Sequence, residues 1–177
     1  KNKHKNYLIK INLIILIIIM NLVNQTNKVL GIYNNPGNLE KGQKYAGETG
    51  KFYGKDDRFV VFDTPEMGVR ALARDIKTKI KNHNGDIAAM ISQYAPKDDD
   101  NETESYINFV KERVGKDKVT EADLPIILRS IINFENKPDV AKRYLQPNVF
   151  STGIMLSNKS FSQDTSFEKA KEMMGIK

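Results

Sequence analysis

Residues 58–81 read RFVVFDTPEMGVRALARDIKTKIK, and this stretch carries the main signals for the fold. After Arg58, residues 59–62 are apolar, with two β-branched valines at their centre, which is typical of a short strand. Thr64, Pro65 and Glu66 then supply an N-cap, a proline at the first helical position and an acid in the first turn. A helix to about Lys81 is predicted by apolar residues at helical spacing: Val69, Leu72, Ala73, Ile76 and Ile80.

The segment before this stretch is dense in glycine and asparagine. Residues 31–54 contain too many turn-forming residues for a helix, so we expect an ordered loop there. At its end, residues 51–53 precede the turn residues 54–57 and are expected to pair with residues 58–62 as a small β-hairpin.

Helical patterns dominate the rest of the chain. Apolar spacing and stop signals predict three helices and a last short one: before Pro96, from Asn101 to a stop at Gly115, from Thr120 onwards, and over 167–174. The signals weaken between residues 136 and 166. The predicted fold class is therefore α+β and predominantly α-helical, with one small β-hairpin near the start of the domain.

Composition excludes several kinds of site. The 177 residues include no cysteine and only two histidines, His4 and His83, so Cys-ligated zinc, thiolate catalysis and sites built from two or three histidines are excluded in the body of the chain. The net charge of +6 invites a nucleic-acid hypothesis, but residues 1–30 hold five lysines and no acid, which leaves +1 for residues 31–177. We therefore expect no nucleic-acid partner, no metal and no cofactor, and any acid–base chemistry should use carboxylates.

The basic N-terminal residues lead into an apolar run. Lys1 to Lys10 precede an apolar stretch of 13 residues, 11–23, which is short of the roughly 20 that span a bilayer. This order predicts a secretory signal or a weakly held anchor over residues 1–30, followed by a single domain over 31–177. The alternative is an ordinary buried N-terminal helix or strand.

Glu135 is the most informative single residue. At about 100° per residue it falls about 20° from Leu124, in the middle of an apolar helix face. A carboxylate there is desolvated, which raises its pKa and lets it act as a general acid. Alternatively, the helix ends by Phe134, and the side chain reaches water or meets Arg129 or Lys137.

Other candidate residues have equally ordinary explanations. Glu40 and Glu48 lie in the glycine-rich loop, where two acids suggest a site, although surface acids usually serve solubility. Tyr94 and Tyr106 either stack on a sugar or pack in the core. The acidic run 98–100 lacks the alternating ligand spacing of a calcium loop, so we interpret it as solvated.

Four segments, in order, resemble one known family. Residues 32–39 (IYNNPGNL) resemble the N-N-P-G-N-[IL] opening of phage-encoded and prophage-encoded cell-wall-degrading proteins. Residues 59–71 resemble that family's F-x-x-F-x-[ST]-P-E-x-G-[IV]-R-A block. Residues 94–96 with 101–106 resemble its Y-A-P…N-x-T…Y block, and residues 134–136 match a late helix that ends in glutamate. The segment after Asn136 matches no block of the family.

The resemblance implies a lysozyme-like muralytic enzyme that cuts the glycan of peptidoglycan by hydrolysis or by lytic transglycosylation. Together with the leader, it implies an endolysin that is exported to the periplasm or anchored in the inner membrane. Glu135 would then protonate the glycosidic oxygen, while Glu48 or Glu40 stabilises the transition state or positions water. The predicted glycan-binding residues are Asn34, Asn35, Asn38, Tyr94 and Tyr106. The competing hypothesis is a non-catalytic virion structural or wall-binding protein.

Overall fold

The computed structural model describes residue 15 and residues 33–51, 58–99 and 102–176. The signal or anchor expected over residues 1–30 lies, apart from Ile15, outside the described residues. Within the described part, no helix is long and apolar enough to cross a membrane.

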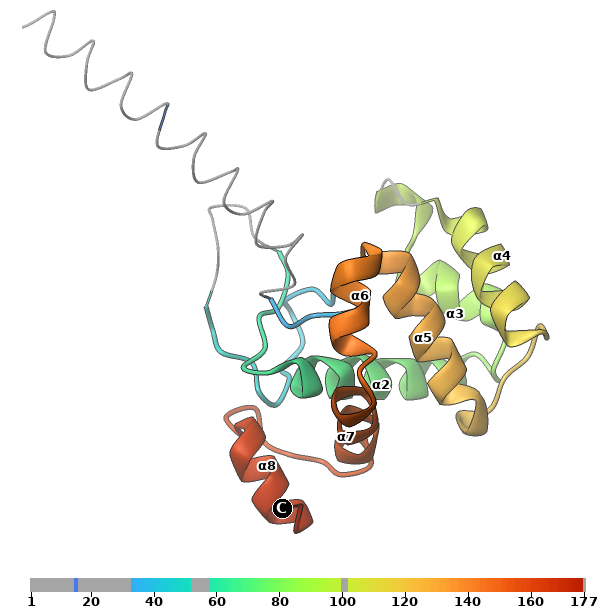
Figure 1. Cartoon of the computed structure of the whole chain (residues 1–177). Helices are drawn as coiled ribbons and strands as arrows, with labels where there is room; N and C mark the ends of the chain where they lie inside the picture. Colours follow the sequence, from blue (N-terminus) through green and yellow to red (C-terminus); the bar gives the residue numbers. More distant parts are fainter. Residues whose placement is uncertain (1–14, 16–32, 52–57, 100–101, 177) are drawn as a thin grey trace, which may run out of the picture.

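Helices form nearly all the regular structure of this part (Figure 1). In chain order the elements are α2 (Pro65–Asn82), α3 (Ile87–Tyr94), the 3-10 turn η1 (Lys97–Asp99), α4 (Thr103–Val114), the 3-10 turn η2 (Glu121–Asp123), α5 (Leu124–Glu135), α6 (Pro138–Tyr144), α7 (Pro147–Ser157) and α8 (Phe167–Met174). The predictions for α2, α3 and α8 are confirmed. Gly115 ends α4 in the left-handed conformation, as its position predicted.

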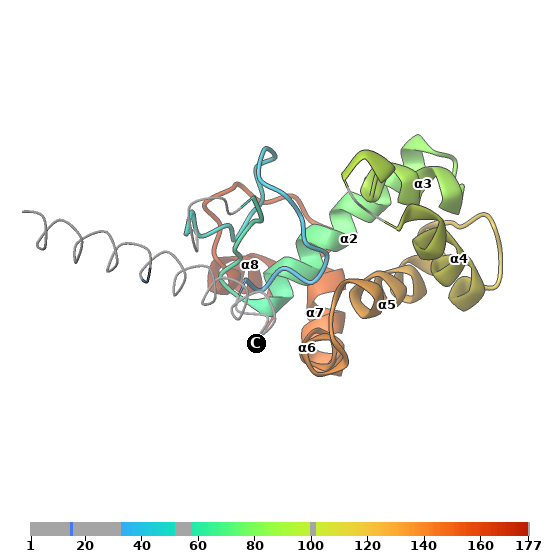
Figure 2. The same cartoon turned by 90° about the horizontal axis from the view of Figure 1, so that it is seen from above.

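The long helix α2 is the centre of the arrangement. Its most extensive contacts are with α7, and it also packs against α5, α6 and α3. Residues 33–51 and 58–62 lie along its N-terminal half, whereas α3 and α4 lie towards its C-terminal end (Figures 1 and 2). Helix α2 therefore links the loop residues 33–51 and 58–62 with the helices α3 and α4.

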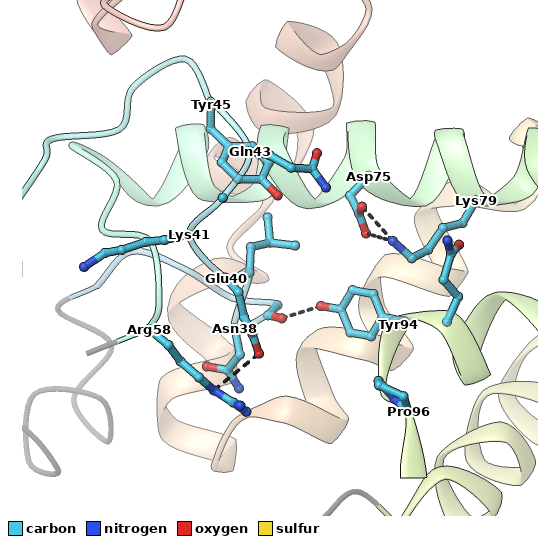
Figure 3. A pocket seen from close by; sticks show the side chains of 14 residues that line it. Asn38, Glu40, Lys41, Gln43, Tyr45, Arg58, Asp75, Lys79, Tyr94 and Pro96 are labelled. Atoms are coloured by element: carbon cyan, nitrogen blue, oxygen red, sulfur yellow. Dashed lines mark hydrogen bonds and ion pairs between the residues drawn. The ribbon is translucent and has the colours of Figure 1, made fainter. Parts of the chain in front are cut away.

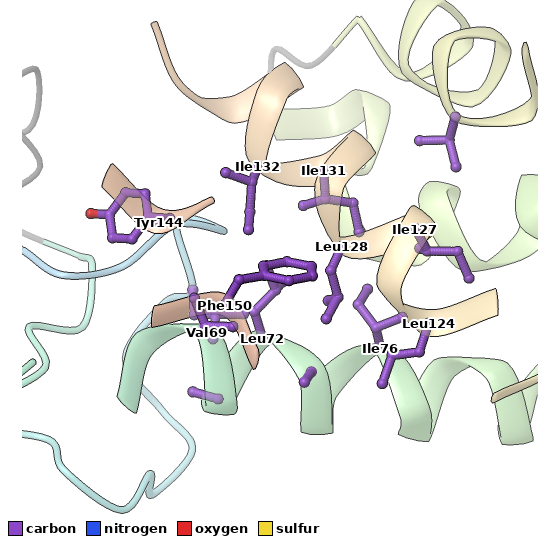
Figure 4. Packing of buried hydrophobic residues seen from close by; sticks show 14 of the residues in the cluster. Val69, Leu72, Ile76, Leu124, Ile127, Leu128, Ile131, Ile132, Tyr144 and Phe150 are labelled. Carbon is purple, nitrogen blue, oxygen red and sulfur yellow. The ribbon is translucent and has the colours of Figure 1, made fainter. Parts of the chain in front are cut away.

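Apolar side chains of α2 and α5 face each other across the core (Figure 4). Leu72 and Ile76 on α2, and Ile127, Leu128 and Ile131 on α5, are all fully buried. Each such side chain contributes about 1.5–3 kcal/mol through removal from water. The same apolar cluster continues from Leu39 in the loop to Ala170 in α8.

The predicted α+β class is wrong, because the described residues form no strand or sheet and no β-hairpin is seen. The segment 58–63 makes only isolated bridges, Phe59 with Glu40 and Phe62 with Glu48. Two of its carbonyl groups accept from side-chain amides, since the Nδ2 atoms of Asn35 and Asn34 donate to the carbonyl oxygens of Val60 and Phe62, both at 2.9 Å. The carbonyl oxygens of Arg58 and Val61 accept from the backbone N–H groups of Lys41 and Thr49. Residues 52 and 53, expected to form the partner strand, lie outside the described residues.

Helices α6 and α7 form in the region where the sequence signals were weak. Both are short, and each begins with a proline in its first turn, Pro138 and Pro147. Proline is favoured there because the first helical N–H groups have no partner within the helix. The buried residues of α7, Val149, Phe150, Gly153 and Leu156, follow helical spacing, but the run is too short to stand out in the sequence.

Candidate functional site

The end of α5 is tied to a loop from the start of the domain. Glu135 is the last residue of α5 and is half-buried, and Asn38 donates a hydrogen bond of 2.7 Å from Nδ2 to its Oε2. The next residue, Asn136, donates from Nδ2 to the carbonyl oxygen of Pro36 at 2.7 Å. We call residues 34–39 the asparagine loop. The helix does not stop short of Glu135, so the alternative that it ends by Phe134 is wrong.

Two of the asparagines hold the loop itself in shape. Asn35 donates to the carbonyl oxygens of Leu39 and Val60 and accepts from the backbone N–H of Leu39. Asn34 donates to the carbonyl oxygen of Phe62 and accepts from Arg143 at 2.9 Å. Both asparagines are buried. Their amides are therefore hydrogen-bonded inside the protein. Neither side chain offers an exposed amide for the substrate-binding role that the sequence predicted.

Tyr94 contacts the asparagine loop, and Tyr106 packs edge-to-face against Tyr94 with ring centroids 6.2 Å apart. The Tyr94 hydroxyl donates to the carbonyl oxygen of Gly37, and burial, with Glu135 as the next contribution, raises its pKa well above the usual value. Tyr106 is buried, and its ring stacks on Phe134 with centroids 3.8 Å apart. Tyr106 therefore packs, whereas Tyr94 faces the surface cleft described next.

The Tyr106 hydroxyl is close to the candidate acid. Burial raises the pKa of Tyr106 well above its usual value, and Tyr94 and Glu135 raise it further. This hydroxyl has no partner at full hydrogen-bonding geometry among the described residues. Tyr106 therefore stays neutral beside Glu135.

A cleft of about 500 Å³ opens between the asparagine loop, α2 and the end of α3 (Figure 3). Asn38, Glu40, Arg58 and Tyr94 line it. Glu135 does not line the cleft, but it accepts the hydrogen bond from Asn38, which does. The polar groups of the cleft come from four separate segments of the chain, which is typical of a ligand-binding cleft.

The structure separates the two loop glutamates. Glu40 lines the cleft, where its Oε1 lies 3.3 Å from Nε of Arg58 and both side chains are half exposed. Glu48 does not line the cleft; it accepts long hydrogen bonds of 3.4 Å from the backbone N–H of Tyr45 and from Gln163. Of the two, Glu40 is the one in the same cleft as Asn38.

An ion pair on the cleft wall was not predicted from the sequence. Asp75 and Lys79 of α2 are 2.7 Å apart, and only 8% and 14% of their side chains are exposed (Figure 3). Asp75 also contributes, after burial, to raising the pKa of Tyr45 to about 12. The sequence contained a signal for this buried pair. At about 100° per residue, Asp75 and Lys79 fall on the side of α2 next to the buried Leu72.

Metal ligands do not gather in the described part of the chain. No group of three or more His, Asp or Glu side chains is arranged there to hold an ion. The cleft offers amides, tyrosines and paired charges, and behind Asn38 lies the carboxyl group of Glu135, held by the Asn38 amide.

Comparison with known proteins identifies a relative from a phage. No protein-family profile matches the sequence. The chain is 33% identical over 111 residues to Protein P5 of Pseudoalteromonas phage PM2. The aligned region covers 58% of this chain and 68% of the phage protein. The chain therefore belongs to the same family as Protein P5 of Pseudoalteromonas phage PM2.

Proposed function

We propose that this protein cleaves the glycan strands of bacterial peptidoglycan, with Glu135 as the general acid. The observation that carries the proposal is the hydrogen bond of 2.7 Å from Asn38, a residue that lines a polar cleft, to Glu135 directly behind it. An amide that donates to one carboxyl oxygen fixes the orientation of the group, and a general acid must be held within reach of the oxygen that it protonates.

The lining of the cleft suits a sugar polymer. Sugars present many hydroxyl groups and apolar ring faces, and Asn38, Gln43 and Gln93 offer amides while Tyr45 and Tyr94 offer aromatic rings. Both acids that line the cleft are paired with cations, Glu40 with Arg58 and Asp75 with Lys79. Such a balanced surface favours a ligand that is bound through hydrogen bonds.

The second catalytic group depends on the reaction. Hydrolysis requires a carboxylate that positions or activates water, and Glu40 is a better candidate than Glu48 because Glu40 lines the cleft. Lytic transglycosylation needs no such group, because a hydroxyl of the sugar itself attacks. The two routes differ in product, since hydrolysis leaves reducing ends and transglycosylation leaves anhydro-sugar ends.

Clearing of purified sacculi by the full chain tests the proposal. Wild type should clear them, and Glu135→Gln should lower the rate by about 100-fold or more, the usual contribution of a general acid. Glu48→Gln is the matched control, because it makes the same change outside the cleft and should leave the rate unchanged. Glu40→Gln should lower the rate only if the products carry reducing ends.

Two results would contradict the assignment. Full activity in Glu135→Gln would remove this residue as the acid. Wild type that sediments with sacculi without clearing them would favour the second candidate, a non-catalytic wall-binding or virion protein, which the membership of a phage protein family also supports.

We further propose that residues 1–30 direct the chain to the inner membrane or the periplasm. The support is the order of a basic, acid-free stretch and an apolar run in the sequence. Fractionation of cells that express the full chain should recover it in the membrane or periplasmic fraction. Recovery in the cytoplasmic fraction alone would contradict this proposal.

A further inference from the structure

A second cavity adjoins the cleft and differs from it in charge. It has a volume of about 460 Å³ and shares Tyr45, Asp75 and Lys79 with the cleft, so the two form one continuous groove along α2. The residues that line only the second cavity include three cations, Lys44, Arg70 and Arg74. None of these three forms an ion pair with an acid among the described residues.

The two arginines lie one helical turn apart on α2 and are held rigidly. Arg70 is 2% exposed, donates from Nη2 to the carbonyl oxygen of Lys159 at 3.1 Å and lies over the ring of Phe161. Arg74 donates to the carbonyl oxygens of Ser157 and Lys159 at 3.2 and 3.3 Å. Carbonyl groups thus hold the two side chains in place but leave their charges without a counter-ion.

This arrangement is costly without an anion. Burial and the neighbouring charge of Arg74 lower the pKa of Arg70 to about 10. The Nε of Arg70 is buried and has no hydrogen-bond partner in the described structure. A buried cation is ordinarily paired, and an anion in the cavity would relieve both the repulsion and the missing pairing.

We propose that Lys44 and Arg74, backed by the buried charge of Arg70, bind a carboxylate of the peptide stem that peptidoglycan carries on its glycan strand. The inference rests on the proposed function, because a strand in the cleft would carry its stems along the same groove past Tyr45. Guanidinium and ammonium groups bind carboxylates through charge-assisted hydrogen bonds. The cleft would then bind the sugars, and the second cavity would select strands that still carry peptide.

Binding of matched glycan fragments to the full chain tests the inference. The fragments are soluble strands that carry peptide stems and the same strands after an amidase has removed the stems. The titration uses the full chain carrying Glu135→Gln, which should bind the fragments without cleaving them. Calorimetry at low salt should show that it binds the stem-bearing fragment about ten-fold more tightly than the stripped one. Salt should weaken this preference, because it screens the charges.

Variants assign the preference to the cavity. Lys44→Gln, in an exposed loop, and Arg74→Gln should each remove most of the preference, whereas Arg74→Lys should keep part of it. The matched control is Lys77→Gln, which removes a cation from the same helix. Lys77 also reaches the end of α7, 2.6 Å from Oδ1 of Asn158, but does not line the cavity. An equal loss in Lys77→Gln would overturn the inference.

Other results separate this inference from the proposed function. Clearing of sacculi without any preference for stem-bearing fragments would overturn the inference and leave the glycosidase standing. A preference for stems without clearing would support the cavity and overturn the glycosidase. Inorganic phosphate alone serves as a probe of general anion binding, and affinity for it equal to that for the stem-bearing fragment would overturn the carboxylate assignment.

Discussion

At the scale of single residues, the contact between Asn38 and Glu135 joins two positions that are 97 residues apart in the chain. Asn38 has a positive φ of 50°, a conformation that asparagine tolerates better than most residues and glycine adopts without strain. The position therefore serves two purposes, because the backbone makes the turn while the amide orients the carboxyl group.

Replacing Asn38 with glycine separates these purposes. Asn38→Gly keeps the turn and removes the amide, which would hydrogen-bond the carboxylate that forms as Glu135 gives up its proton. The rate of sacculus clearing should therefore fall by about ten-fold or more, as expected for loss of a hydrogen bond to a charged group worth about 1.5–3 kcal/mol. Asn84→Gly is the matched control, since Asn84 also has a φ of 50° but lies in the turn after α2. Unchanged clearing by Asn38→Gly, with Asn84→Gly equally active, would show that the amide does not orient the acid.

Only part of the candidate site could be predicted from the sequence. Glu135 could be singled out because a carboxylate on an apolar helix face conflicts with its surroundings, and helical periodicity exposes that conflict. The engagement of Asn34 and Asn35 could not be predicted, because they donate to the backbone carbonyls of Phe62 and Val60, 28 and 25 residues away, which no local pattern reveals. Asp75 was overlooked because an i, i+4 ion pair is an ordinary feature of helix surfaces.

At the scale of elements, helices with clear ends could be predicted, whereas the strand predicted over residues 58–62 does not form. Helix α2 has an N-cap at Thr64 and a proline in its first turn, and Gly115 stops α4, so local signals determined these ends. The segment 58–62 has strand-like composition, but strand formation depends on a partner. The asparagine side chains and turns of residues 33–51 supply other hydrogen-bond partners, and tertiary contacts therefore override the local preference.

The start of α2 requires glycine at position 68. A Cβ at Gly68 would lie 1.7 Å from the carbonyl oxygen of Asn34, so the helix approaches the asparagine loop backbone to backbone. Gly68→Ala should lower the free energy of unfolding by about 3 kcal/mol or more, at the upper end of the cost of overpacking, because backbone cannot easily move aside. Urea denaturation measures the change.

A second glycine provides the comparison for Gly68. Gly115 has a φ of 76°, and a Cβ at this position would meet nothing within 4 Å, so Gly115→Ala tests conformational strain without a clash. Its cost should be about 1 kcal/mol. Equal costs for the two variants would show that the approach of α2 to the loop is not tight.

At the scale of the whole molecule, several helices meet at the asparagine loop. Helix α3 reaches it through Tyr94, α5 through Glu135 and α6 through Arg143. Segments far apart in sequence thus determine the position of one short loop. Any condition that loosens the helical core should therefore also disturb the candidate site.

High pH provides such a condition, because buried tyrosines surround the loop. Burial raises the pKa of Tyr144 and Tyr45 to about 12, whereas an unfolded tyrosine ionises near its ordinary value of 10.0. Between these values the unfolded chain binds fewer protons than the folded one, so the free energy of unfolding falls as pH rises. The stabilisation is complete below about pH 10 and is lost towards pH 12, with Tyr144 alone contributing on the order of 2 kcal/mol.

Comparison of wild type with Tyr144→Phe isolates this contribution. Phenylalanine cannot ionise, so the stability advantage of wild type over the variant, measured by urea denaturation, should shrink steadily from pH 10 to pH 12. The phenolate absorbance of wild type should appear together with the loss of helical circular dichroism, because the buried tyrosines ionise mainly once the chain unfolds. If the folded protein instead developed its full phenolate absorbance near pH 10, the tyrosines around the asparagine loop would be open to water. The packing between the loop and the helices would then be looser than the burial of Tyr144 and Tyr106 requires.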